Sequence, residues 1–226
     1  MSLLPHLPTA WRGSLPARFA TALPDFALGL GFLITWAVPY TFGQKAVTYF
    51  VLVMLLEFLI VHSAGFMGSV VFTRPLSTRI KVKSLLGLGA FYAIFAAGFA
   101  LGFRAWWPLW AIFALTLNRI LIVLTGDIPA GKERAYIHRG WAVSTLFYLL
   151  FAFLTVFLPM PALGITGEVI RAQAFTASGL WIDEPQRVLA FGFFYFTSLG
   201  FSELFSHRWL PDGHLPQHRT LSETPS

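Results

Sequence analysis

The chain has no cysteine and few charged residues. Without cysteine there is no disulfide, no thiolate nucleophile, no iron–sulfur ligation and no S-acylation. Only 12% of the 226 residues are charged, against roughly 25% in a typical soluble domain. The chain therefore lacks the charged surface that a soluble protein presents to water.

Long apolar runs take the place of the missing charge. Hydrophobic residues make up 56% of the chain, and about 20 apolar residues in helical form are enough to cross a hydrocarbon core of ~30 Å. The sequence predicts an all-α polytopic membrane protein, a bundle of six transmembrane helices within one domain over residues 25–206. The six predicted spans are 25–42, 47–73, 82–103, 105–125, 139–158 and 186–206.

Three segments are predicted to lie outside the hydrocarbon. Residues 1–24 contain prolines and arginines, which favour a basic arm in the cytoplasm or at the membrane interface over a long helix. Residues 207–226 are expected to form a polar cytoplasmic tail. In the external segment 160–185, apolar residues near helical spacing indicate a short amphipathic helix, with an ordered connector as the alternative: Ile165, Val169, Ala172 and Phe175.

The basic residues predict the orientation, because Lys and Arg are enriched in cytoplasmic loops. With six spans, one side holds Arg12, Arg18, Arg74, Arg79, Lys81, Lys83, Lys132, Arg134, Arg139, Arg208 and Arg219. The opposite side holds only Lys45, Arg104, Arg171 and Arg187. This asymmetry predicts a multi-pass protein of the inner (plasma) membrane with both termini in the cytoplasm.

Two patterns argue against nucleotide and nucleic-acid partners. "GDIPAGKE", residues 126–133, matches the start of a phosphate-binding loop, but Glu133 stands where Ser or Thr would hold Mg²⁺, and the pattern follows a membrane span instead of a strand. The chain also lacks the interleaved basic and aromatic residues typical of nucleic-acid binding. The expected partner is the lipid bilayer, and a partner membrane protein or a second copy of the chain is left open.

Small residues in the third span predict close helix packing. Gly98 and Gly102 form a G-x-x-x-G pair, which lets helices approach closely in lipid. Packing within the bundle is the preferred interpretation, and dimerisation is the alternative.

A few ionisable groups lie inside the predicted spans: Glu57 and His62 in the second, Arg119 in the fourth and Glu203 in the sixth. His207 follows one turn after Glu203. A charge at membrane depth costs at least ~2.5–3.5 kcal/mol, so such groups are expected to face the protein interior and to find partners there. We therefore expect them to converge in one polar seam. Asn118, Ser69, Tyr148 and Tyr195 are candidates for supporting hydrogen bonds.

Helix geometry limits how these groups can act together. Five residues turn an ideal helix by about 140°, so Glu57 and His62 do not share a face, whereas Glu203 and His207 do. A metal site is possible only if separate helices contribute single ligands, with Glu57, His62, Glu203 and His207 as candidates. No metal-binding spacing supports it, and no cofactor is predicted.

The charges within the spans do not balance. Arg119 can neutralise one of the two carboxylates, and the other must pair with a protonated His62, be protonated, or face a water-filled cavity. A carboxyl that carries protons and a structural, hydrogen-bonded Glu are the two interpretations left open.

Three functional hypotheses follow, and no catalytic residue is identified. The first is proton- or ion-linked transport, with Glu57 and Glu203 titrating, His62 as proton partner and Arg119 as fixed counter-charge. The second is a non-catalytic accessory or assembly subunit of a membrane complex. The third is a membrane enzyme that uses acid–base or metal chemistry on a lipid-like substrate.

Overall fold

The computed structural model describes residues 15–175 and 178–205, and all regular structure within these residues is helical. This confirms the predicted all-α class. The helices are α1 (Leu15–Ala37), α2 (Ala46–Phe72), α3 (Thr78–Phe103), α4 (Trp107–Thr125), α5 (Gly131–Phe157), α6 (Gly167–Gln173), α7 (Leu180–Asp183) and α8 (Pro185–Leu204).

Five of the described helices, α1 to α5, are long and apolar enough to cross a membrane. By length and composition, they are consistent with a helical, multi-pass membrane protein. The sixth predicted span corresponds to α8, which has 20 residues but carries Arg187 and Glu203 near its two ends and is not among the five. The crossing by α8 and the side on which the termini lie therefore remain predictions. The predicted tail, residues 207–226, lies outside the described residues.

α1 differs from its predicted bounds. It begins at Leu15, well before residue 25, and ends at Ala37 instead of residue 42. Pro16 lies in the first turn, where its missing N–H leaves no helical hydrogen bond unmade, while Pro24 lies inside the helix. The prolines that favoured an irregular arm are thus accommodated, and the predicted arm is helical from residue 15 onwards.

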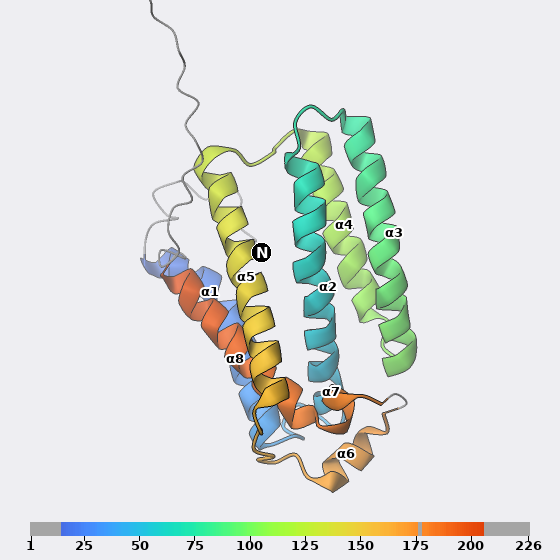
Figure 1. The fold of residues 1–226 in the computed structure, drawn as a ribbon, viewed down its shortest axis with the longest axis vertical. Helices are drawn as coiled ribbons and strands as arrows, with labels where there is room; N and C mark the ends of the chain where they lie inside the picture. Colours follow the sequence, from blue (N-terminus) through green and yellow to red (C-terminus); the bar gives the residue numbers. More distant parts are fainter. Residues whose placement is uncertain (1–14, 176–177, 206–226) are drawn as a thin grey trace, which may run out of the picture.

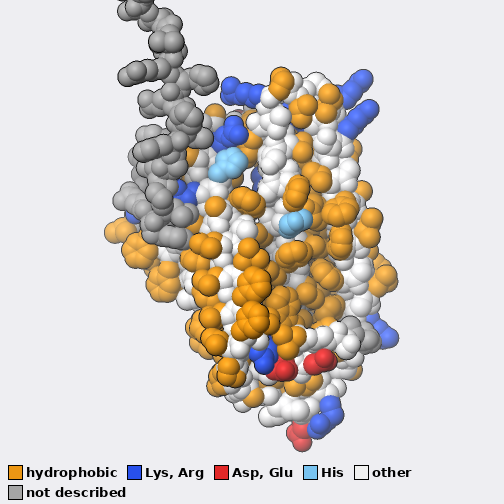
Figure 2. Space-filling view, viewed as in Figure 1, with side chains coloured by type: hydrophobic (Ala, Val, Ile, Leu, Met, Phe, Trp, Pro, Cys, Tyr) orange, Lys and Arg blue, Asp and Glu red, His pale blue; other side chains and the backbone are white. Residues whose placement is uncertain are grey.

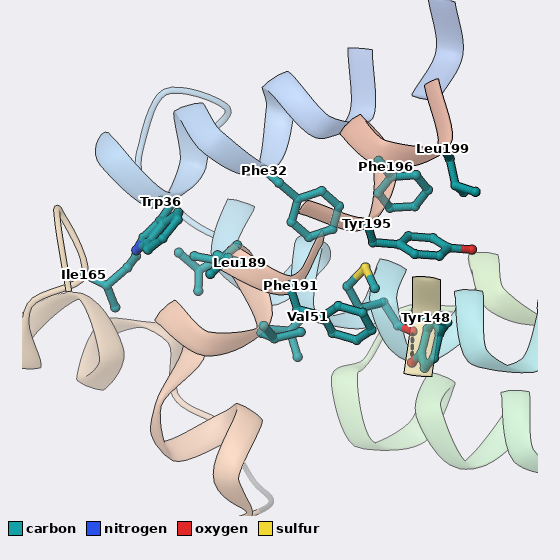
Figure 3. Packing of buried hydrophobic residues seen from close by; sticks show 14 of the residues in the cluster. Phe32, Trp36, Val51, Tyr148, Ile165, Leu189, Phe191, Tyr195, Phe196 and Leu199 are labelled. Atoms are coloured by element: carbon teal, nitrogen blue, oxygen red, sulfur yellow. Dashed lines mark hydrogen bonds between the residues drawn. The ribbon is translucent and has the colours of Figure 1, made fainter. Parts of the chain in front are cut away.

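The long helices form two groups joined by α2 (Figure 1). α1 packs along α8, and α5 also lies against α8, while α3 packs on α4; α2 contacts members of both groups. Each group has its own hydrophobic core. The first core contains the aromatic residues shown in Figure 3, among them Phe32 of α1 and Phe191, Tyr195 and Phe196 of α8. The second core lies between α2, α3 and α4 and includes Tyr92 and Ile112.

Glycines bring α1 and α8 into close contact. A Cβ on Gly192 of α8 would overlap the ring of Phe32, and a Cβ on Gly29 of α1 would lie 2.6 Å from Thr197 Oγ1. Glycine at these positions therefore lets α1 and α8 approach closely. Small residues are typical of helix contacts in lipid, where van der Waals packing has to replace the hydrophobic effect.

The G-x-x-x-G pair of the third span does not have the predicted role in packing within the bundle. Gly98 and Gly102 are exposed on α3, and a Cβ on either would meet nothing within 4 Å. The close approach of α3 to α4 occurs instead at Gly89, where a Cβ would lie 2.6 Å from Thr116 Cγ2. The G-x-x-x-G spacing identified a helix rich in glycine, but it predicted that the face with Gly98 and Gly102 makes the contact, whereas the face with Gly89 does.

The two ends of the bundle differ in charge. The end with the α2–α3 and α4–α5 loops, here called the basic end, gathers Lys and Arg, whereas the Asp and Glu visible in Figure 2 lie at the opposite, α6 end. At the basic end Lys81 is buried, and its Nζ donates to Val71 O over 2.8 Å. A cation therefore satisfies a carbonyl at the C-terminal end of α2.

The external segment is fixed to the α6 end by hydrogen bonds. The side-chain oxygen of buried Gln173 accepts from Thr48 N and Thr48 Oγ1, and its Nε2 donates to Gln44 O. Trp36 Nε1 donates to Pro161 O over 2.9 Å. A short helix, α6, is present here, and Ile165 and Val169 are buried in the first core. The segment thus closes the N-terminal end of α2.

Candidate functional site

Glu57 lies near the middle of α2 and is hydrogen-bonded to α8. The hydroxyl of Tyr195 donates to Glu57 Oε1 over 2.7 Å. Tyr195 is fully buried and Glu57 is partly buried. The carboxyl is therefore held in place by a side chain that approaches from another helix.

Asp25 of α1 links Glu57 to a third carboxyl group, that of Glu203. Asp25 of α1 interacts electrostatically with Glu57 and also with Glu203 of α8. Asp25 and Glu203 are partly buried. Asp25 is thus the middle member of a three-carboxyl group, Asp25, Glu57 and Glu203, here called the acidic cluster.

Asp25 was missed in the sequence because it follows Pro24 at the predicted start of the first span. Residue 25 was the first residue of that span, at its boundary with the predicted arm 1–24. Because α1 begins at Leu15, Asp25 lies three turns inside the helix. The only signal for it is weak, since the segment from Leu15 to Leu23 is rich in Ala and Leu but contains Pro16 and Arg18.

Tyrosines line the inner side of the acidic cluster. Tyr148 of α5 is buried, donates to Met54 O over 3.1 Å and packs edge-on against Tyr195 with ring centroids 5.6 Å apart. Ser144 of α5 also lies near Tyr195. Figure 3 shows Tyr148 and Tyr195 side by side in the first core. The predicted supporting residues Tyr148 and Tyr195 therefore do lie at Glu57.

The expected ion pair with Arg119 is not present. None of the three carboxyls forms an ion pair with a Lys, Arg or His among the described residues. Arg18 of α1 and Glu203 both interact electrostatically with Tyr136 of α5, so a cation lies near this end of the cluster without being paired to it.

Arg119 lies instead in a separate cavity between α2, α4 and α5, together with Ser69. Its Nε is buried and has no hydrogen-bond partner among the described residues. The neighbouring Asn118 is partly buried. The physical reason is the helix arrangement: Arg119 of α4 meets α2 and α5, whereas the carboxyls meet between α1, α2 and α8.

His62 is not part of the acidic cluster either. It is exposed on the bundle surface, its Nδ1 lies 3.0 Å from Tyr92 Oη of α3, and its ring contacts Phe58 and Phe66. This agrees with the helical geometry, which directs His62 and Glu57 to different neighbours. His207 lies outside the described residues.

A metal site gains no support from this arrangement. Among the described residues, no three His, Asp or Glu side chains gather closely enough to hold a metal ion. The candidate ligands Glu57 and His62 face different neighbours, Tyr195 and Tyr92.

The three carboxyls of the acidic cluster are groups that can bind protons. Ionising all three carboxyls at once would place three negative charges inside the bundle, with no cation from the described residues paired to them, which is costly at membrane depth. A proton on one or more of the carboxyls would reduce this cost. The Tyr195 hydroxyl donates to Glu57 Oε1 and so holds that carboxyl in one orientation.

In the comparisons with known proteins, no family model, curated protein or solved structure matches the chain. The functional interpretation therefore depends on the chemistry of the chain itself.

Proposed function

We propose that the protein carries out proton-linked transport, with Asp25, Glu57 and Glu203 as the groups that bind and release the proton. The observation that carries the proposal is the acidic cluster, which is hydrogen-bonded through Tyr195 and has no paired cation among the described residues. Ionisable residues inside membrane helices are costly to keep and typically mark ion pathways.

The order of the three carboxyls along the bundle supports this proposal. Glu203 lies one residue before the end of α8, near the end of the bundle where α1 begins. Asp25 lies three turns into α1, and Glu57 lies near the middle of α2. Asp25 interacts electrostatically with both of the others, which favours Asp25 as the intermediate in a proton relay from Glu203 to Glu57.

Tyr195 completes this path by orienting its innermost member. Because its hydroxyl donates to Oε1, the bond is strongest when Glu57 is ionised and weakens when that oxygen is protonated. Proton arrival at Glu57 thus changes a contact between α2 and α8. Arg119 and His62, expected to act with the carboxyls, are not assigned to this path.

The orientation follows from the charge distribution. We infer that α8 is the sixth span, that the basic end faces the cytoplasm and that both termini lie there, in the inner (plasma) membrane. The support is the concentration of Lys and Arg at the α2–α3 and α4–α5 loops.

A reconstituted flux assay tests the proposed function. Liposomes that contain the purified protein and a trapped pH-sensitive dye are given a potassium diffusion potential, and proton uptake is followed. The wild type should take up protons faster than protein-free liposomes, and Glu57→Gln and Asp25→Asn should fall to the protein-free rate. Repeating the assay with a sodium gradient separates a proton from a small cation.

Matched controls make the same chemical changes outside the acidic cluster. Glu168→Gln on the exposed side of α6 and Asp127→Asn in the α4–α5 loop should both keep the wild-type flux. If the wild type shows no flux above protein-free liposomes with either ion, the transport proposal is wrong and an accessory role becomes the better hypothesis.

A further inference from the structure

A second polar site lies away from the acidic cluster, in a cavity of about 250 Å³ between α2, α4 and α5. Arg119 reaches it from α4, and Phe66 and His138, on α2 and α5, are exposed side chains in its lining. The cavity therefore opens at the side of the bundle. Arg119 lies six residues before the end of α4, about 9 Å from the basic end.

The guanidinium of Arg119 lacks an anion. Its Nε is fully buried without a hydrogen-bond partner, and no carboxylate among the described residues pairs with it. Arg is effectively always charged in proteins, so it cannot escape this cost by losing its proton. A buried donor left unpaired costs more than the average hydrogen bond contributes, so a bound anion would stabilise this site.

A second donor faces the same cavity. Arg134 Nε donates to His138 Nε2 over 3.3 Å, so in the neutral ring the proton lies on Nδ1, which makes that nitrogen a donor. Arg134 also lies over the ring of Phe72, with its guanidinium carbon 5.0 Å from the ring centroid. Arg119 and His138 thus line the cavity, and Arg134 contacts two of its lining side chains, Phe72 and His138.

The remaining walls are apolar or already satisfied. Trp141 Nε1 donates to Val61 O and Ser69 Oγ donates to Gly65 O, so neither hydrogen is available to a ligand. A Cβ on Gly65 would lie 2.8 Å from the Trp141 ring, so the glycine lets the indole settle against α2 as a wall. With Phe66 and Ile137, this gives an apolar slot beside a cationic group.

We propose that this cavity binds a phosphate group, and that the phosphate is the headgroup of an anionic phospholipid. Arg119 matches a phosphate bidentately, and His138 donates a further bond. The apolar walls and the side opening near the basic end suit a lipid whose headgroup lies at that depth and whose chains remain outside. Free inorganic phosphate offers the same anion without the chains.

Lipid binding to the full chain in neutral detergent tests the proposal. Native mass spectrometry and thermal unfolding are measured with phosphatidylglycerol, phosphatidylcholine or sodium phosphate added. Phosphatidylglycerol should bind and raise the unfolding temperature, and phosphatidylcholine should do neither. Arg119→Gln should weaken phosphatidylglycerol binding by about tenfold or more, as expected for a lost charge-assisted hydrogen bond, whereas Arg79→Gln, an exposed arginine of α3, should not.

His138→Gln supplies a second variant on the exposed rim, which leaves the core untouched and should weaken binding several-fold. Without added lipid, Arg119→Gln should be at least as stable as the wild type, because an unpaired cation has been removed. If sodium phosphate reproduces the whole effect, the phosphate site stands and its lipid source is wrong. If Arg119→Gln and His138→Gln both retain the wild-type affinity for phosphatidylglycerol, the site does not exist.

Discussion

The hydroxyl of Tyr195 donates a 2.7 Å hydrogen bond to Glu57 and so joins α8 to α2 in the interior of the bundle. The two residues are far apart in sequence, and the contact links α8, in the first helix group, to α2, the helix that joins the two groups. Among the residues that the structure describes, no other hydrogen bond to Asp25, Glu57 or Glu203 is seen. The Tyr195–Glu57 hydrogen bond is therefore expected to contribute both to stability and to the proposed proton transfer.

Tyr195→Phe removes that contact and should lower both stability and flux. The loss of a buried hydrogen bond to a carboxyl is expected to cost about 1–3 kcal/mol, measured as a lower unfolding temperature in detergent. Proton flux should fall because Glu57 is no longer oriented. Tyr148→Phe is the matched control: it loses a bond to Met54 O, so its stability should fall while its flux is retained. Equal flux in the two variants would remove Tyr195 from the path.

Gln173→Ala should loosen the start of α2. It leaves Thr48 N, Thr48 Oγ1 and Gln44 O without their partner, at an expected cost of about 1–3 kcal/mol. Hydrogen exchange at the Thr48 amide should increase. Gln186→Ala, where the side chain makes only a 3.4 Å contact to Glu184, should leave this exchange unchanged. Unaltered exchange in Gln173→Ala would mean that α6 does not secure α2.

Gly192→Ala should separate α1 from α8. Its Cβ would overlap the Phe32 ring, and overpacking of this kind costs about 1–3 kcal/mol. Gly98→Ala on exposed α3 meets open space and should be neutral or stabilising by up to about 1 kcal/mol, since Ala favours a helix over Gly. The unfolding temperatures of the two variants give the comparison, and a loss of stability in Gly98→Ala instead would indicate that α3 packs on another chain.

Single cysteines test the orientation, because the chain has none of its own. A membrane-impermeant maleimide added to intact cells should label Glu168→Cys on α6. It should label Arg79→Cys at the basic end and Phe205→Cys after α8 only once the membrane is permeabilised. Labelling of Phe205→Cys in intact cells would show that α8 does not cross, and labelling of Arg79→Cys would reverse the bundle.

The existence of the long helices could be predicted because it depends on local composition. Each apolar run is long enough to cross a membrane, and no run contains enough charge to prevent it. The start of α1 could not be predicted from the same signal, since Pro16 and Pro24 argue against a helix by local rules. Pro24 removes one hydrogen bond from the interior of α1, and the close packing of this helix on α8 offsets that loss of stability.

The candidate site could be predicted only in part. Sequence reasoning identified Glu57, Glu203, Tyr148 and Tyr195 as polar residues in spans, since hydrophobic surroundings make them conspicuous. Which of them meet depends on which helices are neighbours, and that is decided by packing between distant segments. The contact of α1 with α8 brings Asp25 into the group, and the position of α4 keeps Arg119 out of it.

The pairing of α1 with α8 also has a consequence for biosynthesis. α1 leaves the ribosome early, but the helix that covers its glycine face is made only after α2 to α7. Until then Asp25 stands in the lipid or the translocon without the neighbours that surround it in the finished bundle. A ribosome that stalls before Pro185 would release a chain in which α1 lacks α8, its packing partner. We expect quality-control proteases to degrade such a chain.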